Sequence, residues 1–266
     1  MEKFLSRLLI WGGIGFLAQF IDGTLGMGYG AFSATLLISA GLAPAIASAS
    51  VHTAEIATTL VSGGAHLWFG NVKKEWLLPL IIPGVIGGAG GAYFLVSIPG
   101  DTMKPFVAGF LLLLGIIVFY RFVFRKQNPQ AAPAKAGTLS RITKSPLKFP
   151  VLGFVAAFLD AVGGGGWGPI ATPGLILTEN QEPSKAVGTV NLAEFFVTIA
   201  ISGTFIFTLG LEMFDWPLVI ALLVGGVIAA PVAAFLCKKL PTRALGILIG
   251  LLLIGVNIRT LLTILL

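Results

Sequence analysis

Apolar runs long enough to cross a lipid bilayer recur from one end of this 266-residue chain to the other. Hydrophobic residues make up 56% of the sequence and charged residues 11%, whereas a soluble domain carries about 25% charged residues. So little charge cannot cover a surface that faces water. The sequence therefore predicts an all-α polytopic membrane protein embedded in the lipid bilayer.

The net charge of +6 does not indicate a nucleic-acid partner, because much of the positive charge lies in one central stretch without acidic residues. Such a stretch is typical of a cytoplasmic loop. The single cysteine, Cys237, excludes an internal disulfide, and with two histidines we expect neither a metal site nor a cofactor. The basic residues of the central stretch are Arg121, Arg125, Lys126, Lys135, Arg141, Lys144 and Lys148.

Two similar glycine-rich turns interrupt the apolar sequence, one within residues 20–32 and one within 158–170. In each, an apolar run ends in an aspartate, passes through several glycines with one aromatic residue, and becomes apolar again. Backbone groups freed by such a break need partners in lipid, and the break is tolerated where the backbone lines a cavity. We therefore look for the functional site at these turns.

The two halves of the chain are copies of one unit. A shift of about 138 residues places Asp22 on Asp160 and aligns the glycines that follow them. We expect a first transmembrane repeat over residues 1–124, a basic cytoplasmic linker over 125–147 and a second transmembrane repeat over 148–266.

Each repeat contains about five apolar segments, and an odd number of membrane crossings would insert the second copy upside down. The charges agree, because a cytoplasmic linker places the pair Lys73 and Lys74 inside and the matching acidic loop of the second copy outside. We expect inverted repeats with both termini outside, although Lys3 and Arg7 argue against an outside N-terminus. The expected segments are 5–21, 31–42, 44–64, 76–96 and 103–124, then 149–159, 170–178, 183–209, 216–236 and 244–266.

Segments 149–159 and 170–178 are too short to cross the bilayer. At 1.5 Å per residue they rise about 16 and 13 Å, against a hydrocarbon core of about 30 Å. We interpret them as a re-entrant hairpin with the glycine turn at its tip. The first copy is expected to enter from the other face, so that two broken hairpins meet near the midplane. Segment 5–21 is long enough to span, which leaves re-entry of the first hairpin open.

The two glycine tips are candidate anion sites. The helix after each turn begins there, so its first amides lack helical partners and its dipole adds about half a positive charge. Glycine lets a ligand approach the bare backbone. The alternative is that these glycines only permit close helix packing. The substrate-binding residues expected at the tips are Gly26, Met27, Gly28, Tyr29, Gly164, Gly165, Gly166 and Trp167.

The third segment of each repeat carries further polar residues. Glu55 and Glu194 lie about 11 residues after a proline, which is roughly 16 Å deep and near the midplane. Each is either a proton carrier coupled to anion binding or a protonated acid in a structural hydrogen bond. His52 and Asn191 lie one helical turn earlier on the same faces, and Thr189 adds a hydroxyl. We expect these three to contact substrate, with packing as the alternative for His52.

Asp22 and Asp160 end the first helix of each hairpin, where the helix dipole disfavours an acid. They are expected either to accept hydrogen bonds from tip amides or to bind a cation or proton. Interfacial positions are expected for His66 and for the tryptophans at helix ends, which are Trp11, Trp68, Trp76 and Trp216.

Both tips carry the pattern Phe-[Ile/Leu]-Asp-x-x-x-Gly-x-Gly, with Pro-x-x-Ala before a polar membrane helix downstream. Segments 47–55 and 186–194 also match each other. This pattern resembles the TauE/SafE family of bacterial membrane proteins, and the likeness covers nearly the whole chain. It implies a permease of the inner membrane associated with sulfite and organosulfonate export. The first tip departs from the glycine run of the second, because Leu25 and Met27 interrupt it.

We therefore expect a multi-pass inner-membrane secondary transporter of small anions, above all sulfite or related sulfur-containing oxyanions and organosulfonates. Alternating access is the expected mechanism, with proton coupling through the two buried glutamates as a hypothesis. An anion channel of the same fold is the alternative. An enzyme is not expected, because Ser50 and His52, two apart on a helix, do not face each other. Assembly as a homodimer is left open.

Overall fold

The computed structural model describes residues 2–124, 147–179, 183–237, 239 and 242–266, and every regular element among them is a helix. The linker expected at 125–147 lies outside the described residues except for residue 147. In chain order the elements are α1 (Glu2–Leu25), α2 (Tyr29–Ser39), α3 (Pro44–Trp68), η1 (Lys74–Trp76), α4 (Leu77–Val96), α5 (Gly100–Phe124), α6 (Lys148–Gly163), α7 (Trp167–Glu179), α8 (Pro183–Leu209), η3 (Leu211–Met213), α9 (Trp216–Leu236) and α10 (Thr242–Leu265).

Six of the described helices are long and apolar enough to cross a membrane, namely α1, α4 with the preceding η1, α5, α8, α9 and α10. α3 has 25 residues but is more polar, because His52, Glu55 and several hydroxyl side chains lie on it. α6 and α7 have 16 and 13 residues. At 1.5 Å per residue they rise about 24 and 20 Å, less than the hydrocarbon core. The helical, multi-pass class expected from the sequence is confirmed.

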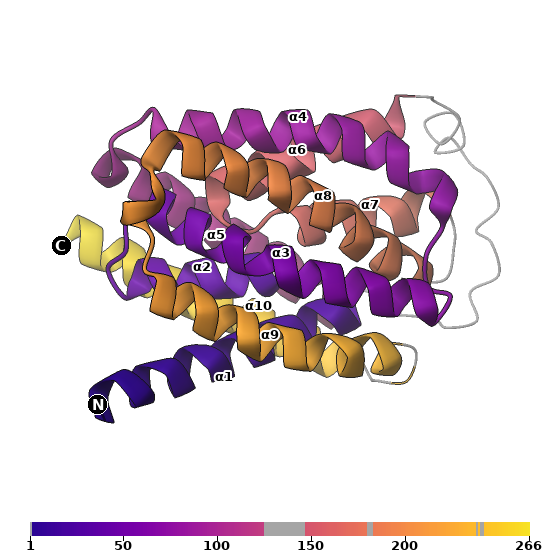
Figure 1. Cartoon of the computed structure of the whole chain (residues 1–266), viewed down its shortest axis with the longest axis horizontal. Helices are drawn as coiled ribbons and strands as arrows, with labels where there is room; N and C mark the ends of the chain where they lie inside the picture. Colours follow the sequence, from indigo (N-terminus) through magenta and orange to yellow (C-terminus); the bar gives the residue numbers. More distant parts are fainter. Residues whose placement is uncertain (1, 125–146, 180–182, 238, 240–241) are drawn as a thin grey trace.

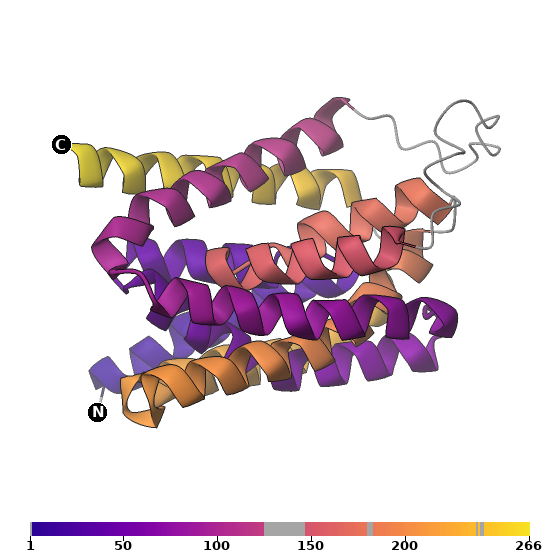
Figure 2. The same ribbon diagram turned by 90° about the horizontal axis from the view of Figure 1, so that it is seen from above.

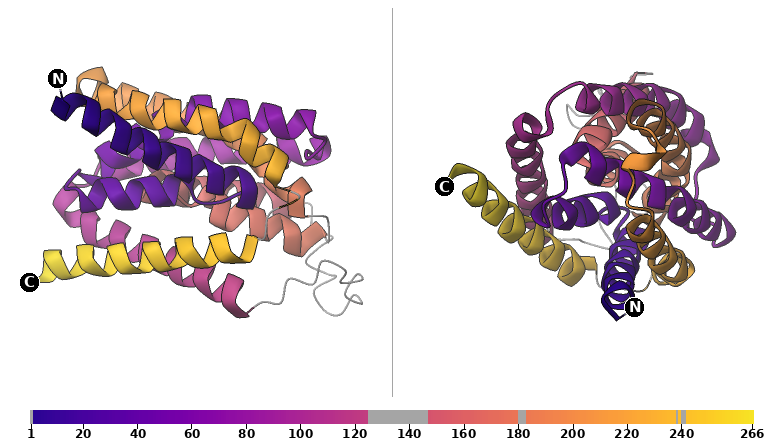
Figure 3. Two further views of the ribbon diagram at one scale, coloured as in Figure 1. Left: turned by 90° about the horizontal axis from the view of Figure 1, so that it is seen from below. Right: turned by 60° about the vertical axis from the view of Figure 1, so that its left-hand side comes forward.

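The helices form one bundle with both chain termini at the same end, here called the terminal end (Figure 1). α5 finishes and α6 begins at the opposite end, here called the linker end (Figures 1 and 2). α1 and α2 form a hairpin that starts and finishes at the terminal end, whereas α6 and α7 start and finish at the linker end. α1 packs on α9, α4 on α6 and α3 on α8, while α5 and α10 lie together along one side (Figure 3).

Each hairpin turns at a glycine with a left-handed backbone. Gly26 has a φ of 67° and Gly164 a φ of 72°, a conformation that residues with a Cβ atom avoid. The amide of each glycine donates to the carbonyl oxygen of the aspartate four residues earlier, at 2.6 Å from Gly26 to Asp22 and 2.7 Å from Gly164 to Asp160. The helix hydrogen bonds therefore continue past both aspartates.

These hydrogen bonds make the helices longer at the turns than the apolar pattern suggested. α6 ends at Gly163 instead of residue 159, and α7 begins at Trp167 instead of residue 170. The apolar pattern stops at the aspartate, but the helix stops only where glycine allows φ to change sign. Three residues, 164–166, connect the two helices.

The two turns pack directly against each other in the core. A Cβ atom built on Gly30 would lie 2.6 Å from the carbonyl oxygen of Gly164, and one built on Gly165 would overlap the backbone of Ala31. The hydroxyl of Thr172 donates to the carbonyl oxygen of Gly26 across the same contact, at 2.5 Å. Backbone meets backbone at this point, which requires glycine.

We expect Gly165→Ala to lower the thermal unfolding midpoint of the detergent-solubilised protein, because the added methyl group would overlap the backbone of Ala31. Overpacking of this kind costs about 1–3 kcal/mol of unfolding free energy. Gly109→Ala on α5 is the matched control, because a Cβ atom there meets nothing within 4 Å. Equal midpoints for the two variants would contradict close packing of the turns.

Candidate functional site

The residues expected at the two tips are gathered in the buried centre of the molecule. Residues 26–29 and 164–167 are all buried. Trp167 is fully buried, and its indole N–H donates to the backbone carbonyl of Val190 on α8 at 3.1 Å. The tips are thus enclosed by protein in this conformation.

Asp160 joins the second tip to α3. Its Oδ1 accepts a hydrogen bond from the amide of Gly166 at 2.6 Å, and its Oδ2 lies 3.1 Å from Nε2 of His52. The other ring nitrogen, Nδ1, lies 2.7 Å from the carbonyl oxygen of Ser48. Because a carbonyl only accepts, Nδ1 of His52 carries a proton. Nε2 and Asp160 then share one further proton, either as a neutral pair or as an imidazolium and a carboxylate.

Asp22 holds the corresponding position in the first tip but faces α8. Its carboxyl group meets the backbone amide of Tyr29 and the side chain of Asn191. The Asn191 side chain accepts from the hydroxyl of Ser62 at 2.6 Å and donates to the carbonyl oxygen of Val187 at 3.3 Å. The aspartate of each tip is therefore held by the long polar helix of the other half of the chain.

Glu55 and Glu194 are buried in the same region, with 1% and 4% of their surface exposed. Oε2 of Glu55 lies 3.9 Å from Nε2 of His52 and has no hydrogen-bond partner. Both glutamates interact electrostatically with Asp22 and Asp160. No lysine or arginine of the described chain is buried. Four acids therefore lie in the interior around His52, without a permanently charged cation of the described residues among them.

Thr189 lies apart from this centre, near the connection between α3 and α4. Its hydroxyl accepts from the amide of Lys73 at 2.9 Å and donates to the carbonyl oxygen of Lys185 at 2.7 Å. Next to it, a Cβ atom on Gly188 would lie 2.8 Å from Cβ of Asn71. The start of α8 and the α3–α4 connection are thus sealed together at the linker end.

His66 and Trp76 are buried, in contrast to the interfacial positions that the sequence suggested. Nε2 of His66 lies 3.0 Å from the carbonyl oxygen of Gly23, and its Nδ1 lies 3.2 Å from the side-chain nitrogen of Asn71. Polar partners inside the bundle satisfy this imidazole, so it needs no contact with water. Trp68 is 88% exposed, as an interfacial tryptophan would be.

The buried polar centre includes residues that the sequence analysis missed, among them Gln19 and Ser48. Ser48 precedes His52 by four residues, and Gln19 precedes Asp22 by three. Residues at these spacings lie on one face of a helix. Helical periodicity extended outward from the acids and the histidine would have found both.

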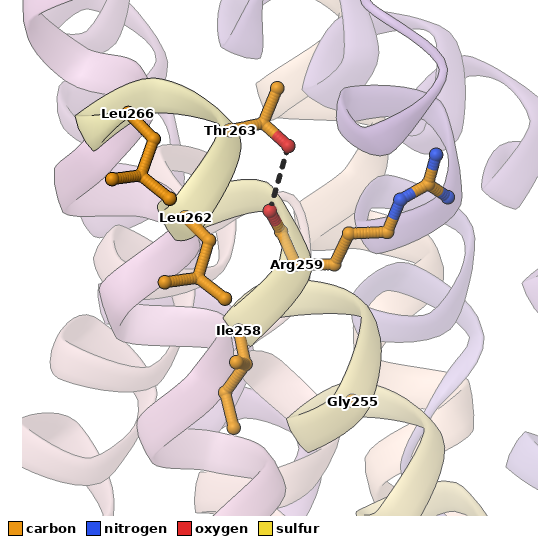
Figure 4. A pocket seen from close by; sticks show the side chains of 6 residues that line it. All are labelled: Gly255, Ile258, Arg259, Leu262, Thr263 and Leu266. Carbon is orange, nitrogen blue, oxygen red and sulfur yellow. Dashed lines mark hydrogen bonds between the residues drawn. The ribbon is translucent and has the colours of Figure 1, made fainter.

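Two hollows lie outside the polar centre. One, of about 440 Å³, lies at the terminal end between the first turn of α3, the α4–α5 connection and the end of α8. The other lies near the end of α10, where Ile258, Leu262 and Leu266 extend to one side of the helix and Arg259 to the other (Figure 4). This second hollow is lined by α10 and the last residue alone and holds no buried polar group, so it is not the candidate site.

A bundle of bilayer-length apolar helices around a buried polar centre defines an integral membrane protein whose functional groups face the interior. The model of the family described as "Sulfite exporter TauE/SafE" matches residues 11–260. The chain belongs to this family, which confirms the resemblance of its two tips.

Two relatives from Bacillus subtilis (strain 168) are similar along most of their length. The chain is 46% identical to "Probable membrane transporter protein YtnM" over 257 residues, which cover 97% of this chain and 83% of that protein. It is 29% identical to "Probable membrane transporter protein YdhB" over 229 residues, 85% of this chain and 89% of that one. No solved structure matches the chain. The protein is a membrane transporter and not an enzyme, as the sequence predicted.

We expect Asp160→Ala to lower the unfolding free energy by on the order of 3 kcal/mol, because it leaves both His52 and the amide of Gly166 without their acceptor in the core. The thermal unfolding midpoint in detergent measures the change. Asp101→Ala is the control, since Asp101 is an exposed acid in the first turn of α5. A midpoint for Asp160→Ala equal to that of the control would show that this contact contributes nothing to stability.

Proposed function

We propose that this protein is a secondary transporter of small oxyanions, above all sulfite or related sulfur-containing anions such as organosulfonates, across the bacterial inner membrane. The observation that carries the proposal is the meeting of two helix N-termini, those of α2 and α7, at the contact between the glycine tips. Helix N-termini bind anions without a fixed cation, and in this proposal the buried glycine backbone becomes accessible when the surrounding elements move. The family description points to the same class of solute.

Inverted repeats that place the two tips near the midplane form part of the proposal. The contacts of the bundle support it. In the proposed repeat, α1 corresponds to α6, α3 to α8 and α4 to α9. The α1–α9 contact then corresponds to the α6–α4 contact, and the α3–α9 contact to the α8–α4 contact, and all four contacts are present. The α3–α8 and α5–α10 contacts map onto themselves. The α1–α2 hairpin starts and finishes at the terminal end and the α6–α7 hairpin at the linker end, as inversion requires (Figures 1 and 2).

We place the linker end in the cytoplasm and both termini outside. The α3–α4 connection and the starts of α8 and α10 lie at the linker end and carry Lys73, Lys185 and Arg243. The connection between α8 and α9 lies at the terminal end and carries Glu212 and Asp215. Basic residues are enriched in cytoplasmic loops, which supports this orientation.

Alternating access is the proposed mechanism, with the two repeats moving about the tips. The linker end is closed where Gly188 and Thr189 contact the α3–α4 connection. The terminal end instead has the 440 Å³ hollow beside the first turn of α3, which is the repeat counterpart of the first turn of α8. In alternating access, one end of the bundle is closed while the other is open, and the proposed movement of the two repeats would produce this difference.

We expect an oxidised disulfide between Asn71→Cys and Gly188→Cys, in a Cys237→Ala background, to stop transport in proteoliposomes, and a reductant to restore it. A Cβ atom on Gly188 would lie 2.8 Å from Cβ of Asn71 and closer still to its carbonyl oxygen, so the α3–α4 connection has to shift outward to reach the separation of about 3.8 Å of a disulfide. The same double-cysteine protein kept reduced is the control. Full transport by the cross-linked Asn71–Gly188 pair would show that the linker end does not open.

Proton coupling through Glu55 and Glu194 is part of the proposal, because an anion next to ionised carboxylates in a weakly polar interior is repelled. We expect sulfite uptake into proteoliposomes to accelerate when the side of entry is acidified, and Glu55→Gln and Glu194→Gln to flatten that dependence by imitating the protonated acid. Sulfite itself is protonated to the same extent in the wild-type and variant assays, so a difference between them comes from the protein. Empty liposomes measure leakage. Wild-type pH dependence in both variants would end the coupling proposal.

An anion channel is the rival function. Saturable sulfite uptake that is stimulated by sulfite on the far side would support a carrier, whereas single-channel current in planar bilayers would support the rival. A homodimer is a separate proposal, and the mass of the detergent-solubilised protein tests it.

A further inference from the structure

The first half of the chain holds a group of buried polar atoms that have no hydrogen-bond partner. They are Oδ2 of Asp22, the hydroxyl of Tyr29, Oε2 of Glu55 and both side-chain polar atoms of Gln19. Each of these four side chains is at least 98% buried. Buried polar atoms are nearly always hydrogen-bonded, so a group of unpartnered ones needs an explanation.

The side chains of Asp22, Tyr29 and Glu55 lie in one region of the core. The hydroxyl of Tyr29 interacts electrostatically with both Glu55 and Asp22. The ring of Tyr29 and the side chain of Thr58, one turn beyond Glu55, both lie against Gly226. This contact brings α2 beside the acidic turn of α3. Gln19 lies one turn before Asp22 on α1, on the same face.

The second half of the chain has no equivalent group. Ala157 stands at the repeat position of Gln19, and Trp167 at that of Tyr29. The Trp167 indole N–H is bonded to a backbone carbonyl, and both oxygens of Asp160 have partners. The unpartnered acceptors therefore form one site in one repeat, and not a symmetric pair.

We propose that Gln19, Asp22, Tyr29 and Glu55 form a subsite for the primary ammonium group of a small zwitterionic sulfonate whose acidic group faces the tip amides. This inference rests on the proposed function and narrows its substrate class. An ammonium group offers three donors and needs acceptors, which two carboxyl groups, a phenol and an amide oxygen supply. It also balances two acids that no lysine or arginine of the described core neutralises.

Two other occupants account for fewer of these atoms. A metal ion would draw on the free carbonyls at the end of a broken helix, but those of Phe20, Ile21, Asp22 and Gly23 already accept hydrogen bonds. Protons on the two acids would supply two donors to these side chains, one fewer than an ammonium group supplies. The three N–H donors of an ammonium group can reach up to three of the four side chains, and its charge replaces the proton that a simple anion would require on Glu55.

The test compares three probes in counterflow assays with proteoliposomes of the full chain. 2-Aminoethanesulfonate carries the ammonium group, ethanesulfonate lacks it, and N-acetyl-2-aminoethanesulfonate keeps the nitrogen without the charge. We expect the first to be preferred over the other two by about tenfold or more, the effect of one charge-assisted hydrogen bond. Equal transport of the three probes overturns the subsite and leaves the proposed function standing. Failure of all three and of sulfite overturns both.

Variants locate the preference. Asp22→Asn and Tyr29→Phe should bring the ratio of 2-aminoethanesulfonate to ethanesulfonate close to one, and Tyr29→Phe does so without altering packing. Glu194→Gln is the matched comparison from the other repeat, and it should change the two rates alike and leave the ratio. A ratio that persists in both first-repeat variants places the ammonium elsewhere. If the wild-type protein transports 2-aminoethanesulfonate and ethanesulfonate at equal rates, the ammonium subsite is wrong. Dependence of those rates on sodium would then identify a metal ion as the occupant, and dependence on pH a proton.

Discussion

The contact between two glycine turns in the middle of the bundle is the constraint on which the rest of this structure depends. Gly30 and Gly165 bring two backbones together with no room for a Cβ atom. This approach places the ends of four helices at one buried point. It also sets where the aspartates before the turns lie, because each is tied to its own turn by a backbone hydrogen bond.

The aspartates then connect the two halves of the chain. Asp160 meets His52 on α3, and Asp22 meets Asn191 on α8, so each tip is held by the polar helix of the other half of the chain. The alternating-access movement that we propose would change both contacts together. The two contacts differ in chemistry, since an imidazole can gain a proton and an amide cannot. The two tips are therefore held by groups of different chemistry.

The charge of the interior narrows what the protein can transport. Four acids surround the glycine tips, and no lysine or arginine of the described residues is buried with them. Burying uncompensated charge is expensive, so such a centre must be neutralised by protons, by hydrogen bonds or by the solute itself. Asp160 uses hydrogen bonds. Oδ2 of Asp22 and Oε2 of Glu55 have no hydrogen-bond partner, so their neutralisation falls to protons or to the solute that we propose.

Much of this arrangement follows from the sequence because a bilayer permits few solutions. Apolar length and the similarity of the two halves located all ten α-helices. The tips were recognised from an aspartate followed by several glycines. The ends of α6 and α7 differed by three to four residues from the expected segments. An apolar pattern reports burial, whereas a helix ends where its hydrogen bonds end.

The sequence by itself determined the membrane class, the family and the residues that form the tips, because length, hydrophobicity and motif are local properties. Only the tertiary structure decided which partners those residues have. It buried His66 against Gly23, drew Thr189 to the linker end and added Gln19 to the polar centre. Such pairings join residues far apart in the chain, and their geometry arises from helix packing that no local pattern records.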